Sequence, residues 1–135
     1  MISPDQLKQV PLFADLDERD LGSLARTLDE HSFEAGDQVT VEGEPGVGFF
    51  VIESGEAVVE IGGRDVRTLS AGDYFGEISL LAQSPRTATI TATMALRCYG
   101  LMPWEFKPLV EDTPTLAWKL LQRLAQQLAD ATSVL

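Results

Sequence analysis

One glutamate and one arginine stand near each other in a stretch that is otherwise uncharged. Glu77 and Arg86 are nine positions apart within residues 75–90, where Gly76 precedes the first and Pro85 precedes the second. A guanidinium can bind two oxygens of a phosphate at once, and an ionised carboxylate accepts a strong hydrogen bond from a hydroxyl group. The pair could therefore hold an anion and a neighbouring hydroxyl at one site.

A short helix is expected to begin at Gly76. The first backbone N–H groups of a helix have no partner within it, and together with the helix dipole they favour an anion. We expect the N–H groups of Glu77, Ile78 and Ser79 to contribute to this anion site. The single charge of Arg86 suits a phosphodiester better than a triphosphate. Because a carboxylate beside it suits a ribose hydroxyl, the pattern indicates a cyclic nucleotide.

Residues 32–102 have the pattern of an antiparallel β structure. Short runs with alternating side chains are separated by turn sequences about every eight to twelve residues, which is typical of a sandwich or jelly roll. We interpret Ser54-Gly55 and Gly62-Gly63 as two-residue hairpin turns, because glycine tolerates the positive φ that such turns require. Residues 87–93 alternate strictly, which predicts a strand directly after the arginine.

Helices are expected on both sides of the β region. Residues 1–31 carry apolar residues at helical spacing, with Pro11 as an interruption and Asp15 or Asp17 as the cap of the second helix. Residues 103–135 are expected to form a hinge and a long helix. The predicted fold is thus α+β, a single domain with an antiparallel jelly-roll barrel between N-terminal helices and a C-terminal helix.

The C-terminal helix carries two apolar stripes. One stripe, of Leu116, Leu120 and Ala125, is expected to pack against the domain itself. The second stripe follows the alternating four- and three-residue spacing of a coiled-coil seam. Its members are Ala117, Leu121, Leu124, Leu128, Ala131 and Leu135. We expect this seam to pack on a second copy of the chain, giving a homodimer.

The order of these motifs resembles that of cyclic nucleotide-binding domains. Residues 75–89, which contain FGEISLL and PRTAT, are similar to the phosphate-binding cassette of that family. Residues 71–74 (AGDY) match the approach to the cassette, and residues 36–37 (GD) and 42–46 (EGEPG) match the early barrel strands. The resemblance covers nearly the whole chain. It extends to catabolite activator protein-like sensor domains, whose helix-turn-helix has no counterpart in this sequence.

The resemblance implies a role for each polar group of the cassette. Glu77 would bind the ribose 2′-hydroxyl of the ligand. Arg86 would bind the cyclic phosphate, helped by the backbone N–H groups of Gly76, Ile78 and Ser79.

The resemblance also implies contacts to the base. Thr87 stands where family members contact the phosphate or the base, and Thr132 or Ser133 falls near a base contact on the C-terminal helix. The sequence looks like a bacterial member of the family, and such members usually prefer cAMP. The resemblance therefore makes cAMP the expected ligand. The hydroxyl of Thr87 leaves cGMP open, since it can reach a guanine amino group. Binding would order the cassette and shift the hinge and the final helix.

Composition argues against several other functions. The formal net charge of −11 opposes direct binding to nucleic acid or to an anionic membrane surface. The single cysteine, Cys98, favours a reducing, cytoplasmic location. The single histidine, His31, excludes a multi-histidine metal centre and offers no Ser-His-Asp set. We expect neither a metal, nor a cofactor, nor an enzyme activity.

These observations predict a regulatory or sensor module that signals cyclic nucleotide binding through its C-terminal helix to an unidentified effector protein. Two alternatives stay open. The chain could be a dimerisation or scaffold domain with a degenerate pocket, or the sensor fragment of a transcription regulator.

Overall fold

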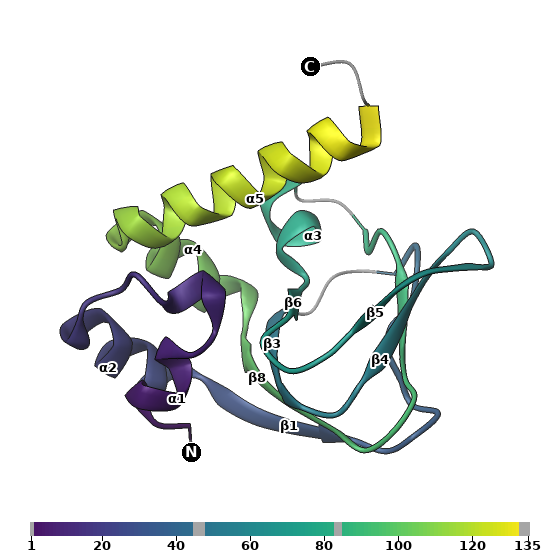
Figure 1. Ribbon diagram of the computed structural model, residues 1–135, viewed down its shortest axis with the longest axis horizontal. Helices are drawn as coiled ribbons and strands as arrows, with labels where there is room; N and C mark the ends of the chain where they lie inside the picture. Colours follow the sequence, from purple (N-terminus) through teal and green to yellow (C-terminus); the bar gives the residue numbers. More distant parts are fainter. Residues whose placement is uncertain (1, 45–47, 83–84, 133–135) are drawn as a thin grey trace.

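Three short helices open the chain (Figure 1). The computed structural model describes residues 2–44, 48–82 and 85–132. The opening helices are α1 (Pro4–Lys8), the 3₁₀ helix η1 (Pro11–Phe13) and α2 (Glu18–Thr27). Asp17 caps α2, because its Oδ1 atom accepts a hydrogen bond of 2.8 Å from the backbone N–H of Asp20. The predicted interruption at Pro11 and the cap at Asp17 are confirmed.

Eight strands follow among the described residues, all paired in antiparallel fashion. They are β1 (Asp29–Phe33), β2 (Gln38–Thr40), β3 (Phe49–Ser54), β4 (Ala57–Ile61), β5 (Arg64–Leu69), β6 (Tyr74–Phe75), β7 (Thr89–Ala92) and β8 (Leu96–Leu101). One sheet has the order β1-β8-β3-β6 and the other the order β2-β7-β4-β5. The predicted α+β fold is confirmed, with the first strand starting three residues earlier than expected. Hydrogen bonds between the described strands leave two separate sheets rather than a closed barrel.

The two predicted glycine turns have different outcomes. Gly62 and Gly63, with φ of 59° and 80°, join the paired strands β4 and β5, so this hairpin is confirmed. The hairpin predicted at Ser54-Gly55 is wrong, because β3 and β4 belong to different sheets. The chain passes from one sheet to the other there, and Gly55 is required because a side chain would collide with the carbonyl oxygen of Ala95. The strand expected over residues 87–93 is shorter and forms β7.

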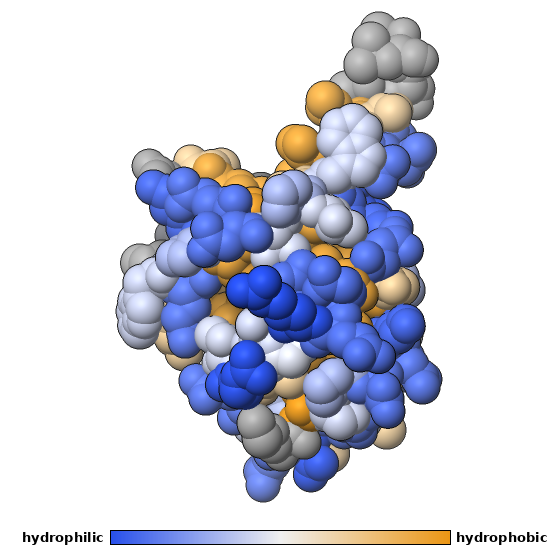
Figure 2. Space-filling view, turned by 90° about the vertical axis from the view of Figure 1, so that its left-hand side faces the viewer, coloured by the Kyte–Doolittle hydropathy of each residue, from blue (hydrophilic) through white to orange (hydrophobic). Residues whose placement is uncertain are grey.

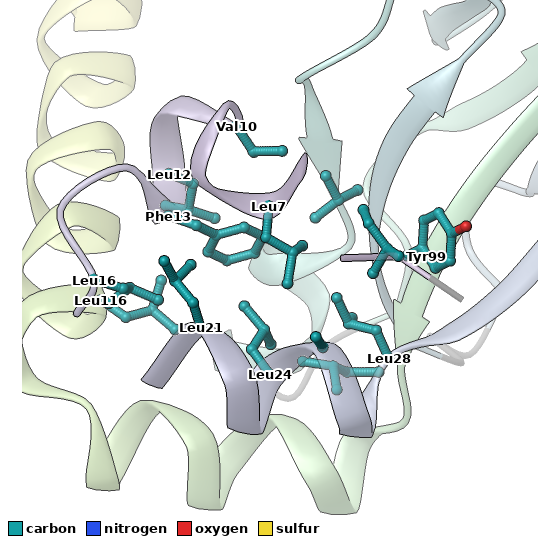
Figure 3. Packing of buried hydrophobic residues seen from close by; sticks show 14 of the residues in the cluster. Leu7, Val10, Leu12, Phe13, Leu16, Leu21, Leu24, Leu28, Tyr99 and Leu116 are labelled. Carbon is teal, nitrogen blue, oxygen red and sulfur yellow. The ribbon is translucent and has the colours of Figure 1, made fainter. Parts of the chain in front are cut away.

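The buried side chains form two clusters. The larger one joins the N-terminal helices to the first sheet and to the C-terminal helices (Figure 3). Its members include Leu7, Leu12, Phe13, Leu21, Leu24, Phe49, Tyr99, Phe106, Leu116 and Leu120. The smaller cluster brings together residues of both sheets, among them Phe50, Ile52, Val59, Leu69, Phe75, Ile90 and Cys98. The first cluster thus fixes the start of the final helix relative to the sheets.

The chain ends with helices α4 (Pro103–Asp112) and α5 (Pro114–Thr132). Leu116 and Leu120 of α5 are buried, as predicted, whereas Ala125 of the same predicted stripe is exposed. The Nζ atom of Lys119 also forms an ion pair of 2.7 Å with Asp15. Beyond Leu120, α5 continues across the top of the molecule, above the short helix α3 (Glu77–Ala82) (Figure 1).

The outer side of α5 carries apolar side chains in contact with solvent. Leu121 is 58% exposed and Trp118 is 63% exposed. Figure 2 shows a largely hydrophilic face on which hydrophobic side chains gather where α5 projects from the body. Leu135, the last residue of the predicted seam, lies outside the described residues.

Candidate functional site

A cavity of about 610 Å³ brings most of the predicted site residues together. It lies between the second sheet, the segment around α3, and the C-terminal half of α5. Its apolar lining includes Val59, Ile61, Val66, Leu69, Ala88 and Ile90. Its polar lining includes Arg67, Glu77, Arg86, Thr87, Gln127 and Asp130. An apolar cavity of this size with a few polar groups is suited to a small ligand that combines a flat ring with polar substituents.

Arg86 is held rigidly in this cavity. Its side chain is 5% exposed, and its Nη2 atom donates a hydrogen bond of 2.8 Å to the carbonyl oxygen of Gly48. Its Nη1 atom donates one of 3.3 Å to the carbonyl oxygen of Gly76. The backbone N–H of Arg86 donates a hydrogen bond to the carbonyl oxygen of Glu44, and its carbonyl oxygen accepts one from the N–H of Gly43. These two bonds fix the residue from a second side. The Nε atom is buried and has no partner.

Glu77 is the buried acidic group of the same cavity. Its side chain is 5% exposed, and its Oε2 atom has no hydrogen-bond partner. Burial raises the pKa of Glu77 above its usual value, while a hydrogen bond from its own backbone and the charges of Arg67 and Arg86 act in the opposite direction. Burial lowers the pKa of Arg86, and the carboxylate of Glu77 opposes that shift.

Gly76 is the residue that allows these two side chains to meet. It has a φ of +100°, and a Cβ atom at this position would collide with the carbonyl oxygen of Gly48 and press on the guanidinium of Arg86. Only glycine fits this combination of positive φ and close backbone approach. The sequence therefore places a glycine where the loop before β3 and the start of α3 touch.

The other predicted site residues are placed as follows. Thr87 lines the cavity and is exposed. Ile78 and Ser79 belong to the first turn of α3, but the structure does not describe their side chains. Thr132 is the last residue of α5, and its side chain is not among those that the structure describes. Ser133 lies outside the described residues.

The cavity also contains residues that the sequence did not single out. Arg67 and Tyr74 come from β5 and β6, and Gln127 and Asp130 come from α5. Burial, with a smaller effect of Glu77, raises the pKa of Tyr74 to about 12, so its hydroxyl stays neutral. A sequence signal for Arg67 does exist: it precedes the buried Leu69 by two residues, and residues two apart in a strand face the same side.

Two other features are absent from the described part of the chain. No group of three or more His, Cys, Asp or Glu residues there is placed to hold a metal ion. Across the same residues, none of the helices has the length and apolar character needed to cross a membrane.

Comparison with known proteins assigns the family. The model of the cyclic nucleotide-binding domain matches residues 30–113. The cAMP-dependent protein kinase regulatory subunit of Eremothecium gossypii is 45% identical over 98 residues, which is 72% of this chain and 21% of that protein. This chain therefore spans about a fifth of the length of that relative.

Solved structures agree with this assignment. PKAR CBD2 with bound Sp-2Cl-cAMPS has a TM-score of 0.82 at 30% identity, over 95% of this chain and 88% of the other. The catabolite activator protein of Thermus thermophilus has a TM-score of 0.83 at 25% identity, over 90% of this chain and 59% of the other. The chain belongs to the cyclic nucleotide-binding domain family, as its sequence motifs predicted.

Proposed function

We propose that this domain is a sensor that binds one cyclic nucleotide, cAMP in preference to cGMP, in the 610 Å³ cavity. One observation carries the proposal: a buried acceptor, Oε2 of Glu77, and a buried donor, Nε of Arg86, lack partners in the same cavity. Buried polar groups are normally satisfied, so unpartnered ones in a cavity favour a missing ligand. The required ligand presents a hydroxyl to the first and an anionic oxygen to the second.

The separation of the two charges supports a ligand that fits between them. Glu77 and Arg86 do not form an ion pair with each other, although both are buried in one cavity. Two opposite charges removed from water would normally be paired. A cyclic nucleotide places a ribose hydroxyl and a singly charged phosphate side by side. In the proposed complex Glu77 accepts from the 2′-hydroxyl and Arg86 binds the phosphate, with backbone N–H groups of Gly76, Ile78 and Ser79.

The relatives support cAMP as the nucleotide. The regulatory subunit that is 45% identical belongs to a cAMP-dependent kinase, and the PKAR CBD2 structure contains Sp-2Cl-cAMPS. The base would extend along the apolar lining toward Thr87 and the end of α5, where we place Thr132 as a further contact. The exposed Thr87 is the group through which cGMP could still be accepted.

We further propose that α5 transmits the signal to an effector protein. Gln127, Asp130 and Ala131 line the cavity, so a bound ligand would contact α5 beyond the part that Leu116 and Leu120 anchor. A ligand that contacts one position of α5 better than another shifts its equilibrium position. In this role the whole chain acts as one domain, cytoplasmic and without enzyme activity of its own.

The experiment is a comparison of cAMP affinity in the wild type and Arg86→Ala by titration calorimetry. Because charge-assisted hydrogen bonds contribute about 1.5–3 kcal/mol each, the substitution should weaken binding by roughly 10- to 100-fold. Arg97→Ala is the control, since Arg97 pairs with Glu30 at the surface and does not line the cavity. Circular dichroism verifies that Arg86→Ala still folds without the two carbonyl contacts. Undiminished affinity in a folded Arg86→Ala protein would contradict the proposed site.

A second proposal, homodimerisation through α5, rests on the apolar side chains that α5 exposes. Trp118 and Leu121 are more than half exposed, and Leu121 belongs to the coiled-coil spacing described above. A second copy of the same helix is the partner that such a repeating seam fits. A dimer would bring two nucleotide sites into one signalling unit.

A further inference from the structure

We infer that Arg67 is a positioning residue of this site, which holds the carboxylate of Glu77 in the form that accepts a ribose hydroxyl. The inference rests on the proposed function and adds a residue that the cassette motif does not contain. Arg67 lies in β5, the edge strand of the second sheet. Its neighbour in that sheet is β4, which separates it from β7, the strand that follows Arg86.

The strand geometry brings Arg67 into the cavity. It is paired with Val59 of β4, and both residues line the 610 Å³ cavity, as does Leu69 two positions later. The register of β4 and β5 shifts immediately beyond this pair, between Val59 and Glu60. Such a bulge ends the regular alternation, so that Val66 also reaches the cavity. Arg67 is exposed, and its place in the sheet puts it at the border of the cavity.

Arg67 is also located at the border of a second cavity. This smaller cavity, of about 310 Å³, shares Arg67, Tyr74, Gln127 and Asp130 with the first. No other described residue forms a hydrogen bond or an ion pair with the guanidinium of Arg67. Arg67 and the buried Glu77 line the same cavity, and the positive charge of Arg67 acts on the carboxylate of Glu77.

The two arginines act differently on Glu77. Burial is the largest influence and raises the pKa of Glu77; among the charges that oppose it, Arg67 contributes more than Arg86. Both Nη atoms of Arg86 donate hydrogen bonds to carbonyl oxygens, and its Nε atom is buried without a partner among the described residues. Tyr74 faces Glu77 from β6 as a neutral hydroxyl, while Arg123 and Asp130 reach this region from α5.

Removing the charge of Arg67 should make nucleotide binding more sensitive to low pH. A carboxyl group whose pKa is raised is protonated over a wider range of pH, and the protonated group is the weaker acceptor. Removing the charge of Arg67 should raise the pKa of Glu77 further. The pH below which nucleotide affinity is lost should then move upward.

The first test measures Glu77 itself in the ligand-free protein. The side-chain carboxyl resonance of Glu77 is followed by NMR as a function of pH in the wild type, Arg67→Met, Arg67→Lys and Arg64→Met. Arg67→Met should raise the pKa of Glu77 by roughly half a pH unit or more. Arg67→Lys should restore it, and Arg64→Met should leave it unchanged, because Arg64 is in the same strand but lines neither cavity. An Arg67→Met titration that superimposes on the wild type would overturn the inference.

The second test measures cAMP affinity of the same four proteins from pH 5 to pH 8. The affinity of Arg67→Met should be lost at a higher pH than that of the wild type, with recovery in Arg67→Lys. A purely structural role would weaken binding equally at every pH and would not be rescued by lysine, and that result would also overturn the inference. If the wild type does not bind cAMP, the proposed function fails, while the NMR titration still decides the role of Arg67.

Discussion

At the scale of single residues, the site depends on two buried charges that face one cavity without pairing. Arg86 is fixed by the carbonyl oxygens of Gly48 and Gly76, and Glu77 keeps one carboxylate oxygen free. Such an arrangement costs stability in the ligand-free protein, because neither charge fully replaces its lost hydration. The cost is understandable if the nucleotide supplies the missing partners.

The glycine between these groups gives a prediction at the same scale. Gly76→Ala should destabilise the protein and abolish cAMP binding, because alanine at a φ of +100° is strained and its Cβ atom would collide with the carbonyl oxygen of Gly48. Chemical denaturation measures the first effect and titration calorimetry the second.

Gly36→Ala is the matched control for this prediction. Gly36 has a φ of +94°, but nothing lies within 4 Å of a Cβ atom built there. Its substitution should therefore cost only the backbone strain, about 1–2 kcal/mol, and should not alter cAMP binding. Equal losses of stability in the two variants would show that the contact with Gly48 is unimportant.

The sequence singled out the local part of the candidate site and did not single out the distant part. Gly76, Glu77 and Arg86 are close along the chain and were singled out by their types and spacing, and Thr87 was singled out by the family resemblance. Arg67 and the α5 residues enter the cavity only through strand register and the path of the last helix, which depend on tertiary packing. Local spacing places Arg67 on the same strand face as the buried Leu69, but it gives no signal for the α5 residues.

At the scale of elements, α5 has two parts with different roles. Its first two turns carry Leu116 and Leu120, which are 1% and 3% exposed and belong to the main core. Its later turns line the cavity through Gln127, Asp130 and Ala131. The helix is thus anchored in the core near its start and lines the cavity near its end.

Two adjacent leucines test which face of α5 packs on the domain. Leu120→Ala should lower the free energy of unfolding by about 2–5 kcal/mol, as large-to-small substitutions in cores do. Leu121→Ala should change it by no more than about 0.5 kcal/mol, since its side chain is mostly exposed. Both values come from denaturation at a protein concentration low enough to keep the chain monomeric. Similar losses for the two leucines would mean that α5 packs on the domain with another face.

The helices, strands and turns were largely predictable from the sequence. The pairing of the strands and the packing of the helices were less so. The Gly62-Gly63 hairpin and the Asp17 cap follow from local backbone chemistry, and both were confirmed. The Ser54-Gly55 turn has the same local chemistry as a hairpin, yet it connects two different sheets. Ala125 fits the spacing of the buried stripe but is exposed, because α5 has left the core by that point.

At the scale of the whole molecule, Cys98 reports on the intact fold. It is fully buried within the smaller core cluster, and burial raises the pKa of its thiol to about 12. The folded protein should therefore react very slowly with a thiol reagent at pH 8, whereas the denatured protein should react at once. Rapid labelling of the native protein would indicate that the two sheets open far more readily than their packing suggests.

The assembly of two molecules is tested through Leu121. Leu121→Glu should convert the proposed dimer to a monomer in sedimentation velocity, because it places a charge in the apolar seam. Met94→Glu is the control, since Met94 is 49% exposed but lies between β7 and β8, away from α5. A wild type that is monomeric at high concentration would contradict the dimer without affecting the nucleotide site.

The most direct test of the central claim is titration calorimetry of the purified, ligand-free domain with cAMP, with cGMP in parallel. We predict saturable binding of cAMP at one site per chain and weaker binding of cGMP. If neither nucleotide produces heat or competes with a labelled analogue, while circular dichroism shows a folded protein, the cavity does not serve as a nucleotide site. The chain would then be a scaffold domain that keeps the architecture of its family without the ligand.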